Sequence, residues 1–329
     1  MLVLLQVNLL FDFDYMFVFQ SFDSIRLYKE SVITIGTFDG VHRGHQKILD
    51  RLSLLAKKEN LRPVVITFDP HPQIVLQTKN RNPIFLLSSI SERLFLFEKF
   101  GIENVVVVPF TNKFSEVPPK EFILNYLVKQ VGLSKILIGY DHSFGKDREG
   151  NATLLKELSK EYLFEVEQIN PFQDDGTTIS STKIRKALQD ANLDFANKML
   201  GYDYFLEGIV VEGEKRGKKL GFPTANIVPT EKRKLLPSNG VYFTSINIKG
   251  KIFYGMTNIG IRPTFNDIYK PVIEMNIFDF DSYIYKEEIS LTFLKFIRHE
   301  IKFPDVNSLI EQLILDNEYC QNLKNNFYN

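Results

Sequence analysis

Several residue types are scarce in this 329-residue chain, and each scarcity argues against a class of protein. Cys320 is the single cysteine, which excludes an internal disulfide framework and a zinc site built from cysteines. This cysteine usage fits a reducing, cytoplasmic setting. The 40 basic and 40 acidic residues leave no net formal charge, and tryptophan is absent. Both facts argue against a generally basic, nucleic-acid-coating protein.

Long apolar runs are also missing. No stretch reaches the roughly 18 to 20 uninterrupted apolar residues that span a bilayer. Residues 1–19 are apolar, but Asp12 and Asp14 interrupt them and no Lys or Arg precedes Arg26, so the basic start of a secretory signal is lacking. We therefore predict a soluble cytoplasmic protein without a membrane segment, and interpret residues 1–15 as an N-terminal extension outside the fold.

The length and composition fit two globular domains. At roughly 150 residues per domain, the chain predicts two domains rather than one or three. Apolar residues make up 44% and charged residues 24%, which are ordinary values for globular proteins. Disordered, collagen-like and coiled-coil chains have other compositions.

The first half alternates between short β-branched runs and stretches with helical spacing. The predicted strands are 32–36, 64–68, 105–109 and 136–139, and the predicted helices include 45–58, 89–100 and 119–131. Continuous apolar strands separated by helices indicate a parallel sheet covered on both faces.

The pattern changes near residue 200. From Leu206 to Phe296 the sequence consists of strand-like runs separated by Gly and Pro turns, which suggests an antiparallel sandwich or a small barrel. A final helix is predicted at about 305–325. We place the domain boundary between about 190 and 205, with 191–205 as a linker.

The segment GTFDGVHRGH at 36–45 follows the first predicted strand and opens a helix. Free amides and the positive end of the helix dipole make such a helix start an anion site. His42 and His45 lie on one helix face, where both can donate hydrogen bonds to a phosphoryl group as it gains charge. The alternative, a turn with two partly exposed histidines, is disfavoured by the flanking strand and helix. Neither GxGxxG nor a P-loop occurs in the chain.

The segment ISSTKIR at 179–185 is a second phosphate signal. Ser181 or Thr182 would cap a helix whose first turn carries Lys183 and Arg185, a combination that suits an anion. Capped helices with basic first turns are common, so the pattern is weak alone. Because it lies in the same domain as the histidine motif, it predicts a second set of contacts to a bound triphosphate.

Two further loops follow predicted strand ends. GYDHSFGKDREG at 139–150 leaves its strand at the edge where open α/β sheets bind ligands. Asp141 in this loop would hold a nucleotide ribose or magnesium, and Arg148 a phosphate. In TFDPHP at 67–72, two prolines fix a rigid turn, and a structural and a functional role for His71 weigh equally.

In this order, GTFDGVHRGH, TFDPHP, GYDHSFG and ISSTKIR resemble the adenylyltransferase module of bacterial bifunctional riboflavin kinase/FAD synthetases, members of the HxGH nucleotidyltransferase superfamily. The resemblance implies a Rossmann-like domain over 16–190 that transfers AMP from ATP to FMN and releases pyrophosphate. It implies that His42 and His45 stabilise the attacked α-phosphate. The other implied nucleotide contacts are Gly36, Phe38, Gly40, Gly44, Asp141, Ser181, Thr182 and Arg185. His142 is a departure, since many relatives carry Phe there.

The second half contains a basic, glycine-containing loop, EGEKRGKKLGFPTANI at 212–227. Such a run alone is usually a solvated face, and a nucleic-acid patch is a further alternative. Here glycines bracket the run, and Thr224 and Asn226 follow with side-chain oxygens that suit a hard cation. The segment therefore predicts binding of ATP with Mg²⁺.

The same resemblance continues through GKKLGFPTANI, GVY, NIGIRPTF, IEMNIFDF and FIRHEIKF, and so covers about residue 16 to the C-terminus. It implies a six-stranded Greek-key barrel over 206–329, with a C-terminal helix, that phosphorylates riboflavin to FMN. Glu274 would be the general base on the ribityl hydroxyl. The other implied contacts are Gly213, Lys218, Gly221, Thr224 and Asn226 to the nucleotide, Thr224 and Asn226 to the metal, and Asn258 and Arg298 to the flavin. Lys218 and Asn276 depart from the usual Arg and His.

The sequence thus predicts an enzyme with two separate sites, acting on riboflavin, FMN and ATP, without nucleic-acid or membrane partners. One rival is an HxGH transferase with another acceptor, such as pantetheine phosphate or a lipid head group. The PTAN segment at 223–226 and the motif around Glu274 argue against it. The other is a non-enzymatic flavin-binding regulator, which would need no phosphate clamps. The sequence predicts no oligomeric state.

Overall fold

The computed structural model describes residues 16–25, 29–77, 83–140, 143–174, 176–213, 217, 220–263 and 269–327. The chain divides into two compact units, one ending at Ser181 and the next beginning at Thr182. Helices α7 (Ser181–Gln189) and α8 (Leu193–Leu200) follow this point, so part of the expected linker is helical. The domain limits drawn from the sequence stay a prediction. The described residues include no helix long and apolar enough to cross a membrane.

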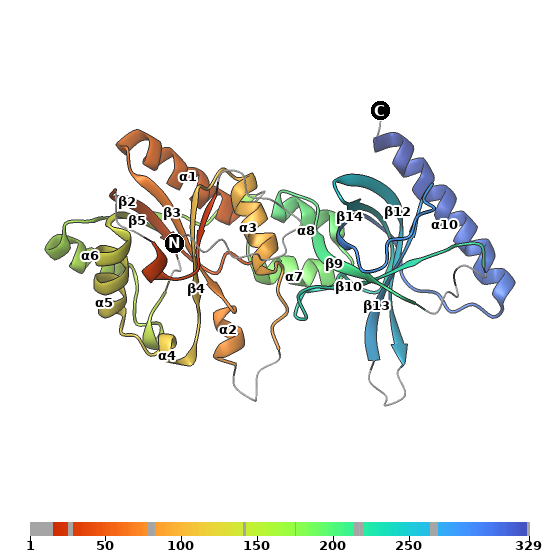
Figure 1. The fold of residues 1–329 in the computed structure, drawn as a ribbon, viewed down its shortest axis with the longest axis horizontal. Helices are drawn as coiled ribbons and strands as arrows, with labels where there is room; N and C mark the ends of the chain where they lie inside the picture. The colour runs from red at the N-terminus through yellow and green to blue at the C-terminus, as the bar shows by residue number, and fades with distance from the viewer. Residues whose placement is uncertain are drawn as a thin grey trace. The chain divides into compact units, whose positions relative to one another are not determined.

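The first unit is built on a six-stranded sheet in the order β1-β4-β3-β2-β5-β6, with every pair parallel (Figure 1). Its strands are β1 (Phe17–Phe19), β2 (Ser31–Ile35), β3 (Arg62–Asp69), β4 (Asn104–Pro109), β5 (Leu133–Gly139) and β6 (Glu165–Ile169). The predicted parallel sheet is confirmed. The chain runs outward from β2 through β3 to β4 and then crosses to β5 on the other side of β2. This reversal makes the carboxyl ends of β2 and β5 the switch point at which such sheets bind ligands.

Helices cover this sheet. They are α1 (Arg43–Glu59), α2 (Pro72–Val75), α3 (Ile90–Lys99), α4 (Asn112–Ser115), α5 (Pro119–Glu121), a wide π-type helix (Phe122–Val131) and α6 (Ala152–Tyr162). Ile33 and Ile66 of the strands share one buried cluster with Leu127 of the π-type helix and Leu155 of α6. Figure 1 shows α1 and α3 on the opposite side of the sheet. A hairpin of β7 (Gln173–Asp174) and β8 (Thr177–Thr178) follows β6.

The second unit contains a closed six-stranded barrel in the order β10-β13-β12-β11-β14-β9. Its strands are β9 (Phe205–Val211), β10 (Ala225–Pro229), β11 (Gly240–Ile248), β12 (Lys251–Pro263), β13 (Tyr269–Ile277) and β14 (Glu288–Arg298). Strands β11, β12 and β13 are consecutive neighbours, and β14 returns beside β11, which is the Greek-key arrangement. The sequence left a sandwich and a barrel open, and the structure decides for the barrel implied by the resemblance.

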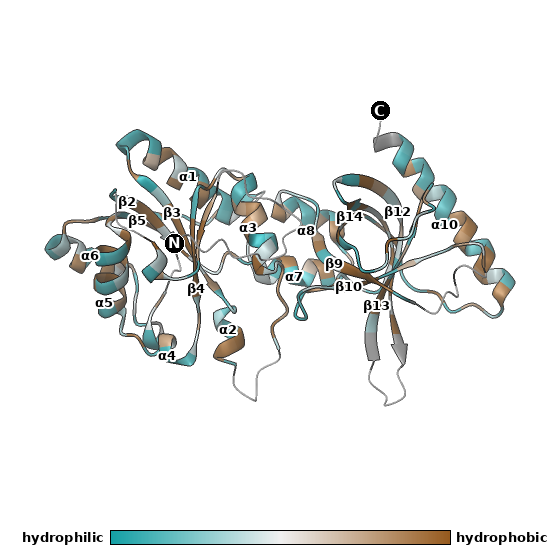
Figure 2. Cartoon of the chain, viewed as in Figure 1, coloured by the Kyte–Doolittle hydropathy of each residue, from teal (hydrophilic) through white to brown (hydrophobic). Residues whose placement is uncertain are grey.

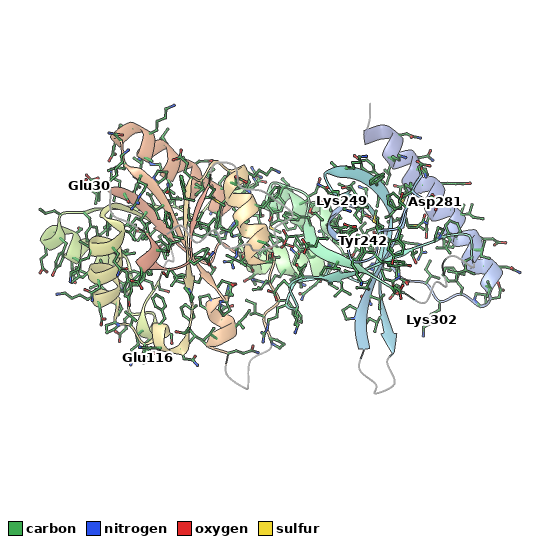
Figure 3. The ribbon with its side chains drawn as sticks, in the orientation of Figure 1. Glu30, Glu116, Tyr242, Lys249, Asp281 and Lys302 are labelled. Atoms are coloured by element: carbon green, nitrogen blue, oxygen red, sulfur yellow. The ribbon has the colours of Figure 1, made fainter. Side chains whose placement is uncertain are left out.

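The C-terminal helix α10 (Val306–Phe327) packs against the barrel. Cys320 of α10 is fully buried in a cluster with Phe243 and Met256 of the barrel. Figure 2 shows apolar residues concentrated on the barrel strands and polar residues along much of α10. In Figure 3 the buried Tyr242 lies within the barrel, whereas Lys249 lies at its exposed surface. The predicted final helix is confirmed.

Candidate active sites

The loop after β2 carries both histidines of the first predicted site. The backbone takes left-handed φ values of 49° at Phe38, 79° at Gly40 and 35° at Val41, and helix α1 then begins at Arg43. His42 is the N-cap of α1, and its Nδ1 accepts a hydrogen bond from the His45 amide over 3.3 Å. Because Nδ1 is an acceptor, a neutral His42 carries its proton on Nε2.

The two histidine rings form one unit at the amino end of α1. Their centroids are 3.6 Å apart and their planes differ by 13°. Burial, and secondly the proximity of His42, hold the pKa of His45 well below its usual range, so His45 is neutral near pH 7. The Nδ1 atom of His45 is buried and has no hydrogen-bond partner among the residues that the structure describes. The predicted pairing of His42 and His45 is therefore present as a stacked imidazole pair in which His45 is neutral.

Other residues predicted to contact nucleotide surround this pair. A Cβ at Gly44 would lie 3.2 Å from the His42 ring, so Gly44 makes room for the cap. A Cβ at Gly36 would lie 3.1 Å from the Phe38 ring, which meets His45 edge-on with centroids 5.2 Å apart. Gly36, Phe38 and Gly44 thus shape the histidine site, and their contact with nucleotide stays a prediction.

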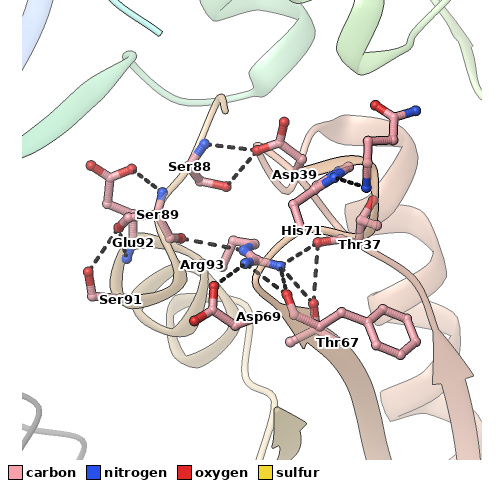
Figure 4. Close-up of polar contacts among 12 residues, drawn as sticks. Thr37, Asp39, Thr67, Asp69, His71, Ser88, Ser89, Ser91, Glu92 and Arg93 are labelled. Atoms are coloured by element: carbon pink, nitrogen blue, oxygen red, sulfur yellow. Dashed lines mark hydrogen bonds and ion pairs between the residues drawn. The ribbon is translucent and has the colours of Figure 1, made fainter. Parts of the chain in front are cut away.

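Asp39 holds this loop in place and was not singled out from the sequence. It is 2% exposed, and its carboxylate accepts hydrogen bonds from the amides of Leu87 and Ser88 at 3.1 and 2.9 Å. The Ser88 hydroxyl in turn accepts from the Gly40 amide at 2.8 Å. This amide is therefore engaged within the protein, although the Gly40 contact to nucleotide itself is untested. Figure 4 shows Asp39 and Ser88 beside a second network around Arg93.

The segment ISSTKIR reaches the same loop through its first helical residue. Ser181 begins α7, and its hydroxyl donates to the carbonyl oxygen of Asp39 over 3.0 Å. The structure therefore brings Ser181 to the histidine loop, as the motif suggested. Because α7 begins at Ser181, Thr182 lies inside the helix and is not its cap, and Arg185 is the fifth helical residue; the phosphate contacts of both stay predictions. Asp141 and His142 lie outside the described residues, as does the side chain of Arg148.

His71 has a structural role. It is the N-cap of α2, where its Nδ1 accepts from the Gln73 amide over 3.1 Å, and it is 6% exposed. The structural role that the sequence suggested is thus present, and a functional role of His71 stays untested.

In the barrel, strand register places the second set of predicted residues in one row. Asn226 on β10 is opposite Glu274 on β13, and Glu274 is also opposite Asn258 on β12. Directly opposite residues on neighbouring strands project from the same face of a sheet. One carboxylate therefore lies between two side-chain amides, although these three residues are far apart in the sequence.

Two contacts flank the start of β10. The Asn226 amide lies over Gly213, where an added Cβ would be 2.0 Å from its nitrogen. Asn276, the departure from His, donates from its amide to the Pro223 carbonyl oxygen at 2.7 Å and so holds the start of the PTAN turn. The asparagine at position 276 therefore supports this turn through its side-chain amide.

The remaining predicted barrel residues have separate surroundings. Gly221 has a left-handed φ of 86°, which favours glycine on conformational grounds, and an added Cβ would meet no atom of the described residues within 4 Å. The Arg298 guanidinium pairs with the buried Asp316 of α10, with the closest atoms 2.6 Å apart. The flavin contacts of Arg298 and Asn258 stay predictions, and Lys218 lies outside the described residues.

A magnesium ion would find oxygen donors at the PTAN turn rather than a carboxylate cage. The described residues hold no group of three or more His, Cys, Asp or Glu side chains suited to a metal. Thr224 and Asn226 offer neutral oxygens, and Mg²⁺ commonly completes its octahedral shell with phosphate and water oxygens. The donor set therefore fits Mg²⁺ entering with ATP as a substrate complex.

Comparisons with known proteins match both units. Residues 25–183 match the family model for FAD synthetase, and residues 200–324 match that for riboflavin kinase. The bifunctional riboflavin kinase/FMN adenylyltransferase of Listeria monocytogenes is 39% identical over 287 residues, covering 87% of this chain and 90% of the relative. That of Bacillus subtilis is 36% identical over 303 residues, covering 90% and 94%.

A solved structure agrees in fold over nearly the whole chain. It is described as a macrolide-efflux protein from Streptococcus pneumoniae, has a TM-score of 0.83 and is 32% identical, covering 94% of this chain and 99% of that one. The HxGH loop at the switch point of a parallel sheet, followed by a closed barrel with a polar row, defines a two-module transferase. The chain belongs to the family of bifunctional riboflavin kinase/FMN adenylyltransferases.

Proposed function

We infer that the chain makes FAD from riboflavin in two ATP-dependent steps. The barrel phosphorylates riboflavin to FMN, and the HxGH unit transfers AMP from ATP to FMN and releases pyrophosphate. The family membership supports this reaction pair. The structural observation that carries it is that each compact unit holds its own constellation, the stacked histidines in one and the row around Glu274 in the other.

In adenylyl transfer, a phosphate oxygen of FMN attacks the α-phosphorus of ATP and the bond to pyrophosphate breaks. Negative charge grows on the α-phosphate oxygens in the transition state, where positioned hydrogen-bond donors act most strongly. The His42 Nδ1 accepts from the His45 amide, and we assign His42 as a hydrogen-bond donor to the α-phosphate. His45 is held neutral beside it, so the pair supplies N–H donors at the positive end of the α1 dipole.

In the kinase reaction, the ribityl hydroxyl oxygen attacks the γ-phosphorus of ATP and ADP leaves. We assign Glu274 as the base that takes the hydroxyl proton, because it is a carboxylate between two amides in the cross-strand row. Asn226 and Thr224 would hold Mg²⁺ and the ATP phosphates. The ion supplies charge neutralisation during phosphoryl transfer, and the protein supplies position.

Chromatography of reaction products tests this proposal. We expect FMN and FAD from riboflavin, ATP and Mg²⁺, and FAD with stoichiometric pyrophosphate from FMN. If the reaction from riboflavin gives FMN but neither reaction gives FAD, the HxGH unit acts on another acceptor. Absence of both products would favour the flavin-binding regulator. Omission of Mg²⁺ should abolish both products, and undiminished synthesis in a chelator would contradict the assignment of Thr224 and Asn226.

A further inference from the structure

Arg93 is a buried cation at the ends of the strands that carry the HxGH loop. It lies on α3, is 1% exposed, and points its guanidinium between the carboxyl ends of β2 and β3 (Figure 4). Its Nη1 donates to the Thr37 carbonyl at 2.8 Å and to the Thr67 hydroxyl at 2.9 Å. Both Nη atoms lie 3.2 Å from the Phe68 carbonyl, and Nη2 is 3.8 Å from the Asp69 carboxylate.

These contacts join two loops that the sequence places about thirty residues apart. Thr37 belongs to GTFDG after β2, and Phe68 belongs to TFDPHP after β3. Strand ends at a ligand-binding edge leave carbonyl groups without ladder partners, and buried carbonyls require donors. A guanidinium supplies five donors in a fixed planar fork, whereas an ammonium is a compact charge that reaches fewer acceptors at once.

A short path leads from Arg93 to the histidine pair. The Thr37 carbonyl that Arg93 holds directly precedes Phe38, whose backbone is left-handed. The Phe38 ring meets His45 edge-on at 5.2 Å and meets Phe97 edge-on at 5.6 Å. Phe97 lies one helical turn after Arg93 on α3, so this helix supports the loop at both its backbone and its aromatic ring.

We propose that Arg93 is a positioning residue for adenylyl transfer, which fixes the carboxyl ends of β2 and β3 so that His45 and His42 keep the orientation required in the transition state. The inference rests on the proposed function of the HxGH unit. Arg93 acts through Thr37 and Phe38 and need not touch the substrates.

The test measures FAD formation from FMN by full-length Arg93→Met and Arg93→Lys variants. A misplacement of about 1 Å at a catalytic group can lower a rate about 100-fold, so we expect kcat of Arg93→Met to fall by about that factor. The KM values for FMN and ATP should change less than about threefold, because the lost interaction acts in the transition state. The kcat of Arg93→Lys should be about tenfold higher than that of Arg93→Met, because lysine keeps the charge and some hydrogen-bond donors.

Arg62 provides a matched control. It is also a buried arginine, 2% exposed, but lies at the amino end of β3, where it donates to the Ser31 hydroxyl and the Val131 carbonyl. Arg62→Met should destabilise the unit to a similar extent and leave kcat for FAD formation within about threefold of wild type. Riboflavin phosphorylation by the same molecules serves as an internal measure of intact protein.

A second readout follows the imidazole itself. NMR titration, with His45→Gln for assignment, should show the low pKa of His45 in wild type and in Arg62→Met. In Arg93→Met it should rise toward the ordinary value, because Phe38 no longer holds the ring in its buried position. An unchanged His45 titration in a folded Arg93→Met protein would overturn the proposal.

Thr67→Val keeps Arg93 and removes one of its hydrogen-bond acceptors. This variant therefore tests the positioning role if Arg93→Met fails to fold. We expect kcat to fall about tenfold in this variant. Values within about threefold of wild type in the folded variants, or an equal loss in Arg62→Met, would overturn the positioning role. Failure of wild type to make FAD would instead overturn the proposed function.

Discussion

Gly213 is the position where a single methyl group tests the kinase site most sharply. An alanine Cβ there would lie 2.0 Å from the amide nitrogen of Asn226 and 2.5 Å from its Cγ. Ordinary contacts begin near 3.4 Å, so the amide must move by at least about 1 Å. Gly213 does not have a left-handed φ, and alanine therefore adds no backbone strain.

This displacement predicts loss of kinase activity with a fold that persists. We propose that the Asn226 amide orients ATP and its ion, and a shift of about 1 Å in this group should then lower kcat for FMN formation about 100-fold. Overpacking should lower the free energy of unfolding by about 1–3 kcal/mol. The assay is chromatographic measurement of FMN from riboflavin, with FAD formation from added FMN as the internal standard.

Gly208→Ala is the matched control. Its Cβ would also be crowded, 2.7 Å from a methyl group of Ile227 and 3.0 Å from the Val228 carbonyl, and Gly208 on β9 pairs with Pro229 and not with Asn226. Its clash falls on Ile227 and Val228 and not on the Asn226 amide, so it should be destabilised to a similar degree and keep its kinase activity within a few-fold. If Gly213→Ala retains the wild-type rate of FMN formation, the role assigned to the Asn226 amide is refuted.

Two further predictions concern single titratable groups. Because folding lowers the pKa of His45, its contribution to stability is complete above pH 6.5 and is lost as the pH falls below that value, by up to about 1.4 kcal/mol per pH unit. Urea unfolding at pH 7.5 and 5.5 should show a smaller difference for His45→Gln than for wild type, and identical differences would contradict the buried neutral imidazole. Burial, and secondly Asp316, raise the pKa of the Cys320 thiol to about 12, so a thiol reagent at pH 8 should label the native protein far more slowly than the unfolded protein. Equally rapid labelling of both states would contradict the packing of α10.

The sequence predicted the sheet better where its strands are central. Strands β2, β3, β4 and β5 are continuous apolar runs, because neighbours and helices cover both of their faces. Strand β6 has the sequence EVEQI, and its residues are exposed or half-buried at the sheet edge, so no apolar run marked it. Strand β1 has only three residues, too few to establish a period.

The chemical groups were easier to predict than the groups that hold them. His42 and His45 belong to a compact motif whose spacing itself brings the side chains together. A buried arginine within a helix has the same sequence appearance as a solvent-exposed one, so Arg93 carried no signal of its own. Asp39 was part of a recognised motif, but the amides that donate to it lie some fifty residues away in the chain.

The barrel row depends on long-range register. Asn226, Asn258 and Glu274 come from three strands, and barrel closure together with a particular pairing aligns them. A shift by one residue would turn each side chain to the other face. Motif resemblance could suggest these residues, but local sequence patterns could not show that they share a row.

Mixing two complementary variants tests the central claim that separate sites perform the two steps. Glu274→Gln removes the proposed base, which should lower FMN formation about 100- to 10,000-fold, while the variant still converts added FMN to FAD. The double variant His42→Asn, His45→Gln keeps a capping side chain at residue 42 and should make FMN without FAD.

The deciding measurement is chromatography of FAD formed from riboflavin, ATP and Mg²⁺ by each variant alone and by the mixture. The account predicts FAD from the mixture and almost none from either variant alone, because FMN released by one protein is adenylylated by the other. Loss of both activities in either folded variant, or continued FAD synthesis by the double histidine variant, would contradict it.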